Sequence, residues 1–140
     1  MRRAAEAPAE KRDAAVQRQA DKFVAFWHKT GIVHFREEEE VLLPAYARYA
    51  RLDQDAAIMR LLADHAEIRA AAQDFERRRA KKLPIEAAAM ARLAKLLHDH
   101  VRFEENDVFP RIERVVGEEN LDAMGRGLTR LHSKTDVCDI

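Results

Sequence analysis

The chain has 140 residues, enough for one domain with a single core, and its 25 Lys and Arg residues balance its 25 Asp and Glu residues. This neutral balance argues against nucleic acid or an anionic membrane as a partner, and no apolar run approaches the roughly 18 residues that a membrane span needs. Only four Gly and four Pro residues interrupt a sequence rich in Ala, Leu, Glu, Arg and Lys, which predicts an all-α fold. A single cysteine, Cys138, and an N-terminus without the apolar stretch of a signal peptide predict a cytoplasmic protein.

The first predicted helix is long. Residues 1–7 have a helical pattern, and we expect Pro8 to interrupt it. From Ala9 to Tyr49 the apolar residues recur at helical spacings, with Gly31 as a weak point and Pro44 as a kink or an end. The predicted inner stripe also carries a histidine and a glutamate, and it consists of Phe23, Trp27, Val33, His34, Glu38 and Val41.

A second helix is predicted from the 50s to about Ala80. Either Asp53 or Asp55 can serve as its N-cap, because a short carboxylate accepts hydrogen bonds from the free backbone N–H groups of a first turn. A histidine lies in the middle of the predicted inner stripe, which consists of Ile58, Leu61, His65, Ile68, Ala72 and Phe75.

A third helix is predicted to begin with Pro84 in its first turn and to end at about Val116, where Gly117 stops it. A short last helix is expected at about Glu118–Met124, before an ambiguous tail. The inner stripe of the third helix again includes a histidine and a glutamate, and it consists of Leu93, Leu96, Leu97, His100, Phe103, Glu104 and Val108.

The first and third helices contain a repeated segment. Residues 34–48 and 100–114 match at an offset of 66, with identical His, Arg, Glu, Glu, Pro and Arg residues at six positions. Internal repetition of this kind indicates that one helical unit is used twice. The repeat contains the pairs His34/Glu38 and His100/Glu104.

The two repeated pairs predict a metal site. A spacing of four residues places an imidazole and a carboxylate on one helix face, about one turn apart. A carboxylate on an apolar stripe is costly to bury unless it is paired or bound to metal. With His65, three histidines and two glutamates share the inner faces of three helices. Imidazole and carboxylate without thiolate suit iron, manganese or zinc.

The other acidic and imidazole groups have simpler interpretations. A lone histidine such as His65 is more often a hydrogen-bonded core residue than a metal ligand. The two repeated His/Glu pairs are what favour the interpretation as a metal site. His28 and His98 fall off the apolar stripes and are expected to be exposed. The remaining acidic residues of the repeats are expected to form a solvated face in which one or two accept imidazole N–H groups, and they are Glu37, Glu39, Glu40 and Glu105.

Over about residues 1–124 the chain resembles the bacterial hemerythrin-like family, the HHE cation-binding domain. The resemblance is carried by the segments His34–Glu39, Asp64–His65 and His100–Glu105, the last followed by Phe109-Pro110. It implies a four-helix bundle with a non-haem di-iron centre that binds or senses O2, NO or peroxide, or responds to iron. It also implies five metal ligands, of which the two glutamates are the candidates to bridge two metals, and these are His34, Glu38, His65, His100 and Glu104.

The sequence departs from the family pattern at its start. The family has a further histidine on an earlier helix, and the repeat offset places that histidine just before Met1. We therefore expect a single domain over 1–140, with 1–8 as the remnant of the first helix and 125–140 as a tail. Three long helices with a short C-terminal helix would leave apolar stripes exposed.

Three solutions to the missing helix remain open. Two chains can pair as a homodimer in which each covers the other's open side, and this is the solution we favour. Alternatively, the tail segment Gly127–His132 takes the place of the first helix, with His132 as the sixth ligand, since it follows His65 by 67 residues. In the third solution the site is incomplete and binds one metal or binds weakly.

Two functions follow from these patterns. In the first, a di-iron site binds a diatomic gas or peroxide at positions that five protein ligands leave open. In the second, the protein is a helical association module with a structural, mononuclear or vestigial metal. The sequence contains no nucleophile–base arrangement, phosphate loop or cofactor fingerprint, so any enzymatic role, which we do not expect, would have to come from the metal.

Overall fold

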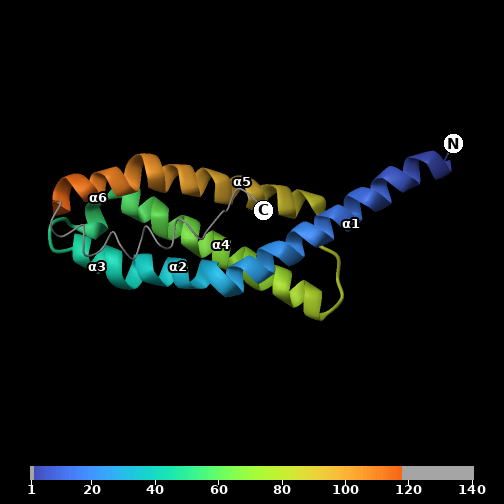
Figure 1. Ribbon diagram of the computed structural model, residues 1–140, viewed down its shortest axis with the longest axis horizontal. Coiled ribbons are helices and arrows are strands. Elements are labelled where there is room, and N and C mark those ends of the chain that lie inside the picture. The colour runs from blue at the N-terminus through green and yellow to red at the C-terminus, as the bar shows by residue number, and fades with distance from the viewer. Residues whose placement is uncertain (1, 118–140) are drawn as a thin grey trace.

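The computed structural model describes residues 2–117, which form three long helical rods and contain no β-strand (Figure 1). None of the described helices is long and apolar enough to cross a membrane. The first rod consists of α1 (Arg2–Phe26), η1 (Trp27–Gly31), α2 (Ile32–Glu37), η2 (Glu38–Leu42) and α3 (Leu43–Tyr46). After a short 3-10 turn, η3 (Leu52–Gln54), the second rod is α4 (Ala56–Ala80). The last rod consists of α5 (Ala87–Phe103), η4 (Glu104–Val108) and α6 (Phe109–Val116).

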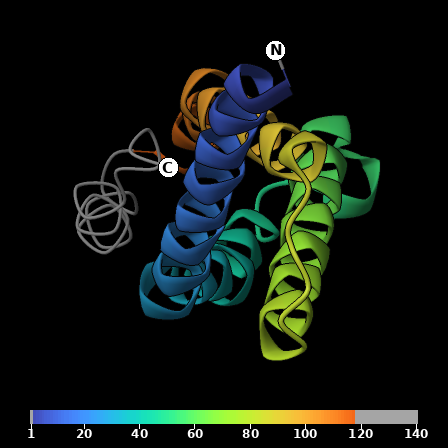
Figure 2. The same cartoon turned by 90° about the vertical axis from the view of Figure 1, so that its right-hand side faces the viewer.

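The rods pack along each other, and the N-terminal part of α1 projects beyond the other two (Figures 1 and 2). Two apolar clusters fill the space between them. One joins α1, α4 and α5 around Phe23, Trp27 and Phe75. The other joins α3, the start of α4 and α6 around Leu42 and Ile112. The predicted all-α class is therefore confirmed, and the described part of the expected bundle has three rods.

Two expectations for the first rod are wrong. Helix α1 runs through Pro8 without the expected interruption. Val33 and Val41, expected on the inner stripe, are 44% and 55% exposed, while Phe35 and Leu42 are buried in their place. The reason is the pair of π turns, η1 and η2, each of which closes a hydrogen bond over five residues and so moves the buried face along the sequence.

Each repeat places its proline two residues after the end of a π turn. Pro44 and Pro110 are the second residues of α3 and α6, which follow η2 and η4. Proline has no backbone N–H, and its ring clashes with the carbonyl group four residues earlier in a regular helix. The wider π turn accommodates both effects. The helix continues past Pro44 only as far as Tyr46.

The second rod follows the prediction closely. The side chain of Asp55 accepts hydrogen bonds from the backbone N–H groups of Ala57 and Ile58 at 3.1 and 3.4 Å, so Asp55 is the N-cap. Asp53 lies in η3 instead. The helix ends at Ala80, as predicted, and all six residues of the predicted inner stripe are buried.

The start of the last rod differs from the prediction. Pro84 lies in the loop, and α5 begins only at Ala87. The side-chain amide of Gln17, on α1, donates to the Ile85 carbonyl at 2.9 Å and accepts from the Ile85 N–H at 3.3 Å. These bonds hold Ile85 out of a helix and place its side chain in the core. The predicted end at Val116 is confirmed, with Gly117 at φ +83°.

The remaining predictions for the C-terminal part, the short helix at Glu118–Met124 and the tail 125–140 with His132, lie outside the described residues.

Candidate metal centre

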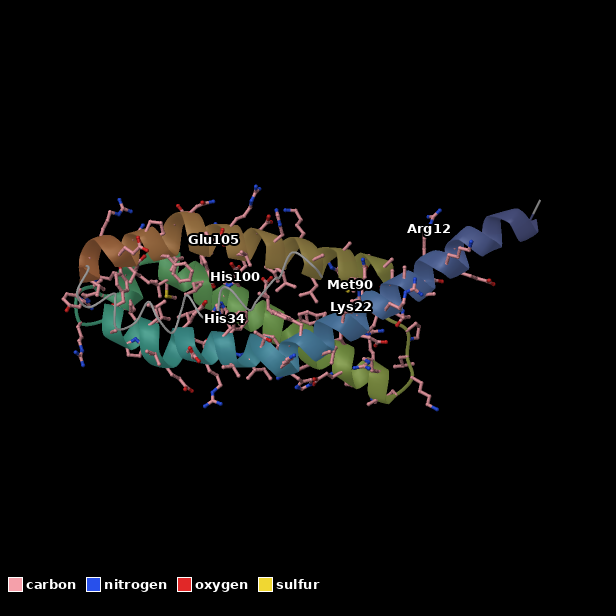
Figure 3. All side chains as sticks on the ribbon, in the orientation of Figure 1. Arg12, Lys22, His34, Met90, His100 and Glu105 are labelled. Carbon is pink, nitrogen blue, oxygen red and sulfur yellow. The ribbon has the colours of Figure 1, made fainter. Side chains whose placement is uncertain are left out.

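All five predicted site residues lie together between the rods, and we call them the His/Glu cluster. His34 is on α2, His65 on α4 and His100 on α5, while Glu38 and Glu104 are the first residues of the π turns η2 and η4. Each of the five is at most 8% exposed. Figure 3 labels His34 and His100 near the middle of the bundle. Apolar clusters lie on either side along the bundle and keep water away from these side chains.

The two glutamates connect the imidazoles of different rods. Glu38 lies 2.6 Å from His34 Nε2 through one oxygen and 3.0 Å from His65 Nε2 through the other. Glu104 lies 2.5 Å from His100 Nε2, 3.7 Å from His65 Nε2 and 3.8 Å from His34 Nε2. Each carboxylate is thus shared between histidines of at least two helices.

The contacts have the distances of close polar pairs but not the directions of hydrogen bonds. Both oxygens of Glu38, Oε1 of Glu104 and Nε2 of His65 and of His100 are buried and have no hydrogen-bond partner. One donor atom from each of these four residues lies within 4.8 Å of the other three. Buried polar atoms without hydrogen bonds are costly, whereas lone pairs directed at a common point are what a cation requires. The residues therefore fit a metal of the iron, manganese or zinc type.

A carboxylate outside the cluster orients His65. Its Nδ1 lies 2.6 Å from Oε2 of Glu39, and both terminal nitrogens of Arg69 donate to the Glu39 carboxylate at 2.9 and 3.0 Å. Because an ionised carboxylate only accepts, His65 donates from Nδ1, and Nε2 is the ring atom that faces the cluster. Carboxylates commonly orient metal-binding histidines in this way.

His100 has a corresponding partner on the neighbouring helix. Its Nδ1 lies 3.1 Å from Oδ2 of Asp64, on α4, so Nε2 again faces the cluster. The ring of Phe35 stacks on the ring of His65 at 3.7 Å and 6° between planes. Phe35 also meets His100 edge-on, with centroids 5.7 Å apart. The two imidazoles are therefore held by a carboxylate on one side and an aromatic ring on another.

The cluster changes the pKa of its members. Burial lowers the pKa of His34, but the carboxylates of Glu104 and Glu38 outweigh burial and raise it to about 10. The same balance, with the same two carboxylates, raises the pKa of His65 to about 9. Burial raises the pKa of Glu104, but the nearby imidazoles of His100 and His34 bring it well below its ordinary value. Without metal, protonated imidazoles therefore balance the buried carboxylates.

The surroundings of the cluster were only partly predictable. His28 and His98 are exposed, as expected, and His28 pairs with Glu76 on the surface. The expectation that one or two acidic residues of the repeats accept imidazole N–H groups fits Glu39. The contacts of Asp64 and Arg69 with the cluster were not predicted, because each joins a residue 30 or more positions away.

Comparison with known proteins gives a family. The model of the hemerythrin HHE cation-binding domain matches residues 1–112, a range that contains the whole His/Glu cluster. No curated protein and no solved structure matches the chain. The match covers more than half of the 140 residues and confirms the resemblance seen in the two repeated segments. The chain belongs to the hemerythrin HHE cation-binding domain family.

Proposed function

We propose that this protein binds two iron ions in the His/Glu cluster and that the di-iron centre binds or senses O2, NO or peroxide. The protein ligands in this proposal are His34, Glu38, His65, His100 and Glu104. Three findings support it: the family match, the burial of all five side chains, and the buried donor atoms that lack hydrogen bonds. Manganese and zinc are the alternatives that the same donor types allow.

One observation favours two metals over one. Each glutamate lies between imidazoles of different rods, with Glu38 between His34 and His65 and Glu104 near all three histidines. A carboxylate has two oxygens and can bind one cation with each, so two shared carboxylates suit a pair of metals that they bridge.

Non-haem iron, when bound, supplies affinity for small oxidants and diatomic gases. The chain's own residues set the conditions for that chemistry. With five protein ligands for two iron ions, positions would remain open for a small molecule. Glu39 and Asp64 hold the Nδ1 protons of His65 and His100, so both Nε2 atoms stay available. Phe35 covers one face of His65 and helps to exclude water.

A second function has its own supporting observation. Glu38, His65, His100 and Glu104 place four donor atoms within 4.8 Å of one another, a set that a single ion can use. A mononuclear or structural metal would then stabilise a helical association module. Its binding surface would be the side of the first rod that exposes Val33 and Val41, and a second copy of the chain would be the partner.

Metal content distinguishes the two functions. We expect protein reconstituted with ferrous iron under anaerobic conditions to retain about two irons per chain and to change its visible absorption when air is admitted. A His100→Ala variant should lose most of this iron, because it removes a buried donor. The matched control is His98→Ala, on the same helix but exposed, which should retain it.

One iron per chain in the wild-type protein would support the association module instead. Equal losses of iron from the His98→Ala and His100→Ala variants would contradict the assignment of the inward-facing histidines as ligands.

A further inference from the structure

A groove lies at the end of the bundle farther from the N-terminus, where α3 packs on α6 (Figure 1). Its volume is about 410 Å³. The first rod and the turn that follows it line the groove with positions 40, 41, 44, 45, 48 and 49, and Val116 lines it from the end of α6. These positions recur every four residues, so they form one continuous stripe along the rod.

The middle of this stripe is apolar and exposed. Val41, Pro44 and Ala45 form it, and Val41 is 55% exposed. Tyr49, at the far end of the stripe, is 49% exposed, and Val115, next to Val116, is 41% exposed. Large apolar side chains that gather in this way at one groove are typical of a surface that binds another protein.

Opposite charges lie at the two ends of the apolar stripe. Glu40 and Arg48 are both exposed, and each is four residues from Pro44. Eight residues of helix span about 12 Å, which is too far for an ion pair between them. Within residues 2–117, Arg48 forms no ion pair. Glu40 lies 3.4 Å from Arg36, but a pair as exposed as this one contributes little.

This order of charges is complementary to itself. A twofold axis at the level of Pro44 places Glu40 of one copy opposite Arg48 of the other, and Arg48 of the first opposite Glu40 of the second. The apolar side chains of Val41 and Ala45 then face each other around the axis. Because the formal net charge of the chain is zero, two copies do not repel each other as a whole.

We propose that this groove is the interface of a homodimer in which the first rods of two copies cross antiparallel at Pro44. Two ion pairs between Glu40 and Arg48 then border an apolar centre, the arrangement of a small protein interface with a polar rim. The pairing goes beyond the proposed metal function and requires no metal. It also gives the second function, the association module, a defined surface and a defined orientation of its partner.

Charge reversal tests the pairing in metal-free, full-length protein. The groove has seven lining residues, fewer than the roughly 20–30 a side of a standard interface, so we expect a dimer with a dissociation constant on the order of 10 µM. Arg48→Glu places like charges opposite each other at both ends and should raise this constant about tenfold or more. Adding Glu40→Arg to Arg48→Glu restores opposite charges and should recover most of the affinity. Sedimentation at several concentrations measures all three.

The matched control is Arg92→Glu, which makes the same change of charge at an exposed position of α5 outside the groove and should leave the dissociation constant unchanged. Far-UV circular dichroism checks that each variant keeps its helix content. The pairing would be overturned by a wild-type protein that is monomeric at about ten times the expected constant. Equal effects of Arg48→Glu and Arg92→Glu would overturn it too, as would an absence of recovery in the variant with both groove charges reversed.

A disulfide between chains tests the position of the axis. A residue next to a twofold axis lies close to its own copy, and a disulfide requires Cα atoms about 4.4–6.8 Å apart. In protein with Cys138→Ser, we expect Ala45→Cys to link most chains into dimers under mild oxidation. Met59→Cys, exposed on α4, is the control and should link few. Equal yields would overturn the interface. Because neither experiment uses iron, a failure here is distinct from a failure of the proposed metal function.

Discussion

At the scale of single residues, the His/Glu cluster depends on carboxylates in two different roles. Glu38 and Glu104 are buried and lie between imidazoles. Glu39 is one position further along the helix, is partly exposed, and holds His65 from outside while Arg69 holds Glu39. Adjacent residues of a helix point in different directions, so Glu38 reaches Nε2 of His65 while Glu39 reaches Nδ1 of the same ring.

The role of Glu39 can be tested against its neighbour. We expect Glu39→Gln to weaken ferrous iron binding by about 10- to 100-fold, the range found when an outer partner of a metal-bound histidine is lost. Glu40→Gln is the matched control, because Glu40 is exposed and, within residues 2–117, forms its ion pair with the exposed Arg36. Competition with a chelator measures both affinities. Equal weakening in the two variants would show a general charge effect instead of orientation of His65.

At the scale of elements, the π turns account for what the sequence predicts well and badly. A period of 3.6 residues correctly predicts the buried stripe of α4, because that helix has no π turn. In the first rod the same period wrongly assigns Val33 and Val41 to the core, because the π turns η1 and η2 shift the buried face and were not predicted from the sequence. Pro44 indicates only that a backbone hydrogen bond of the helix is missing at this point, and it does not indicate a π turn.

Contacts between residues far apart in the sequence are a second limit on prediction. The start of α5 depends on Gln17, which holds the backbone of Ile85 from 68 residues away. The His/Glu cluster, by contrast, is visible in the sequence because the repeat displays the same pair twice. A repeated spacing on two helices is a local pattern, whereas the contacts of Asp64 and Arg69 depend on how the rods pack.

The N-cap of α4, Asp55, is expected to stabilise the fold. Asp55 accepts from two backbone N–H groups and from the Tyr46 hydroxyl at 2.9 Å, and it is buried. Asp55→Ala should lower the free energy of unfolding by about 2–4 kcal/mol, from a lost cap of about 1 and a buried hydroxyl without an acceptor at about 1–3. Urea unfolding measures the change.

Two variants separate the contributions at this cap. Asp53→Ala, in the exposed turn before α4, should leave the free energy of unfolding nearly unchanged. Tyr46→Phe should cost less in the Asp55→Ala background than in the wild-type protein, because the hydroxyl then has no acceptor to lose. The same cost in both backgrounds would mean that the Tyr46–Asp55 bond does not stabilise the fold.

At the scale of the whole molecule, the repeat makes the first and last rods equivalent around one centre. Each contributes a histidine, a glutamate at the start of a π turn, and a proline two residues after the end of that turn. Helix α4 packs against both rods and contributes His65. The apolar clusters on either side of the centre tie the rods together, so folding and assembly of the metal site are coupled.

This coupling predicts opposite pH dependences for the metal-free and metal-bound protein. The pKa of His34 is raised from 6.5 to about 10, so its contribution to stability is fully present below pH 6.5 and is lost as the pH rises toward 10. The pKa of Glu104 is lowered from 4.5, so its contribution is present above pH 4.5 and is lost on acidification. The metal-free protein should therefore be most stable at about pH 5 to 6.5.

Metal binding should have the opposite preference, because a bound ion must displace the protons that His34 and His65 hold up to about pH 10 and 9. The stabilisation by metal grows with affinity and reaches about 2.7 kcal/mol when free metal is 100 times the dissociation constant. We therefore expect the gap between the unfolding temperatures of iron-loaded and chelator-treated protein, measured anaerobically at fixed free iron, to widen from pH 6 to pH 8.5. A gap that stays constant over this range would mean that iron does not replace protons on these imidazoles.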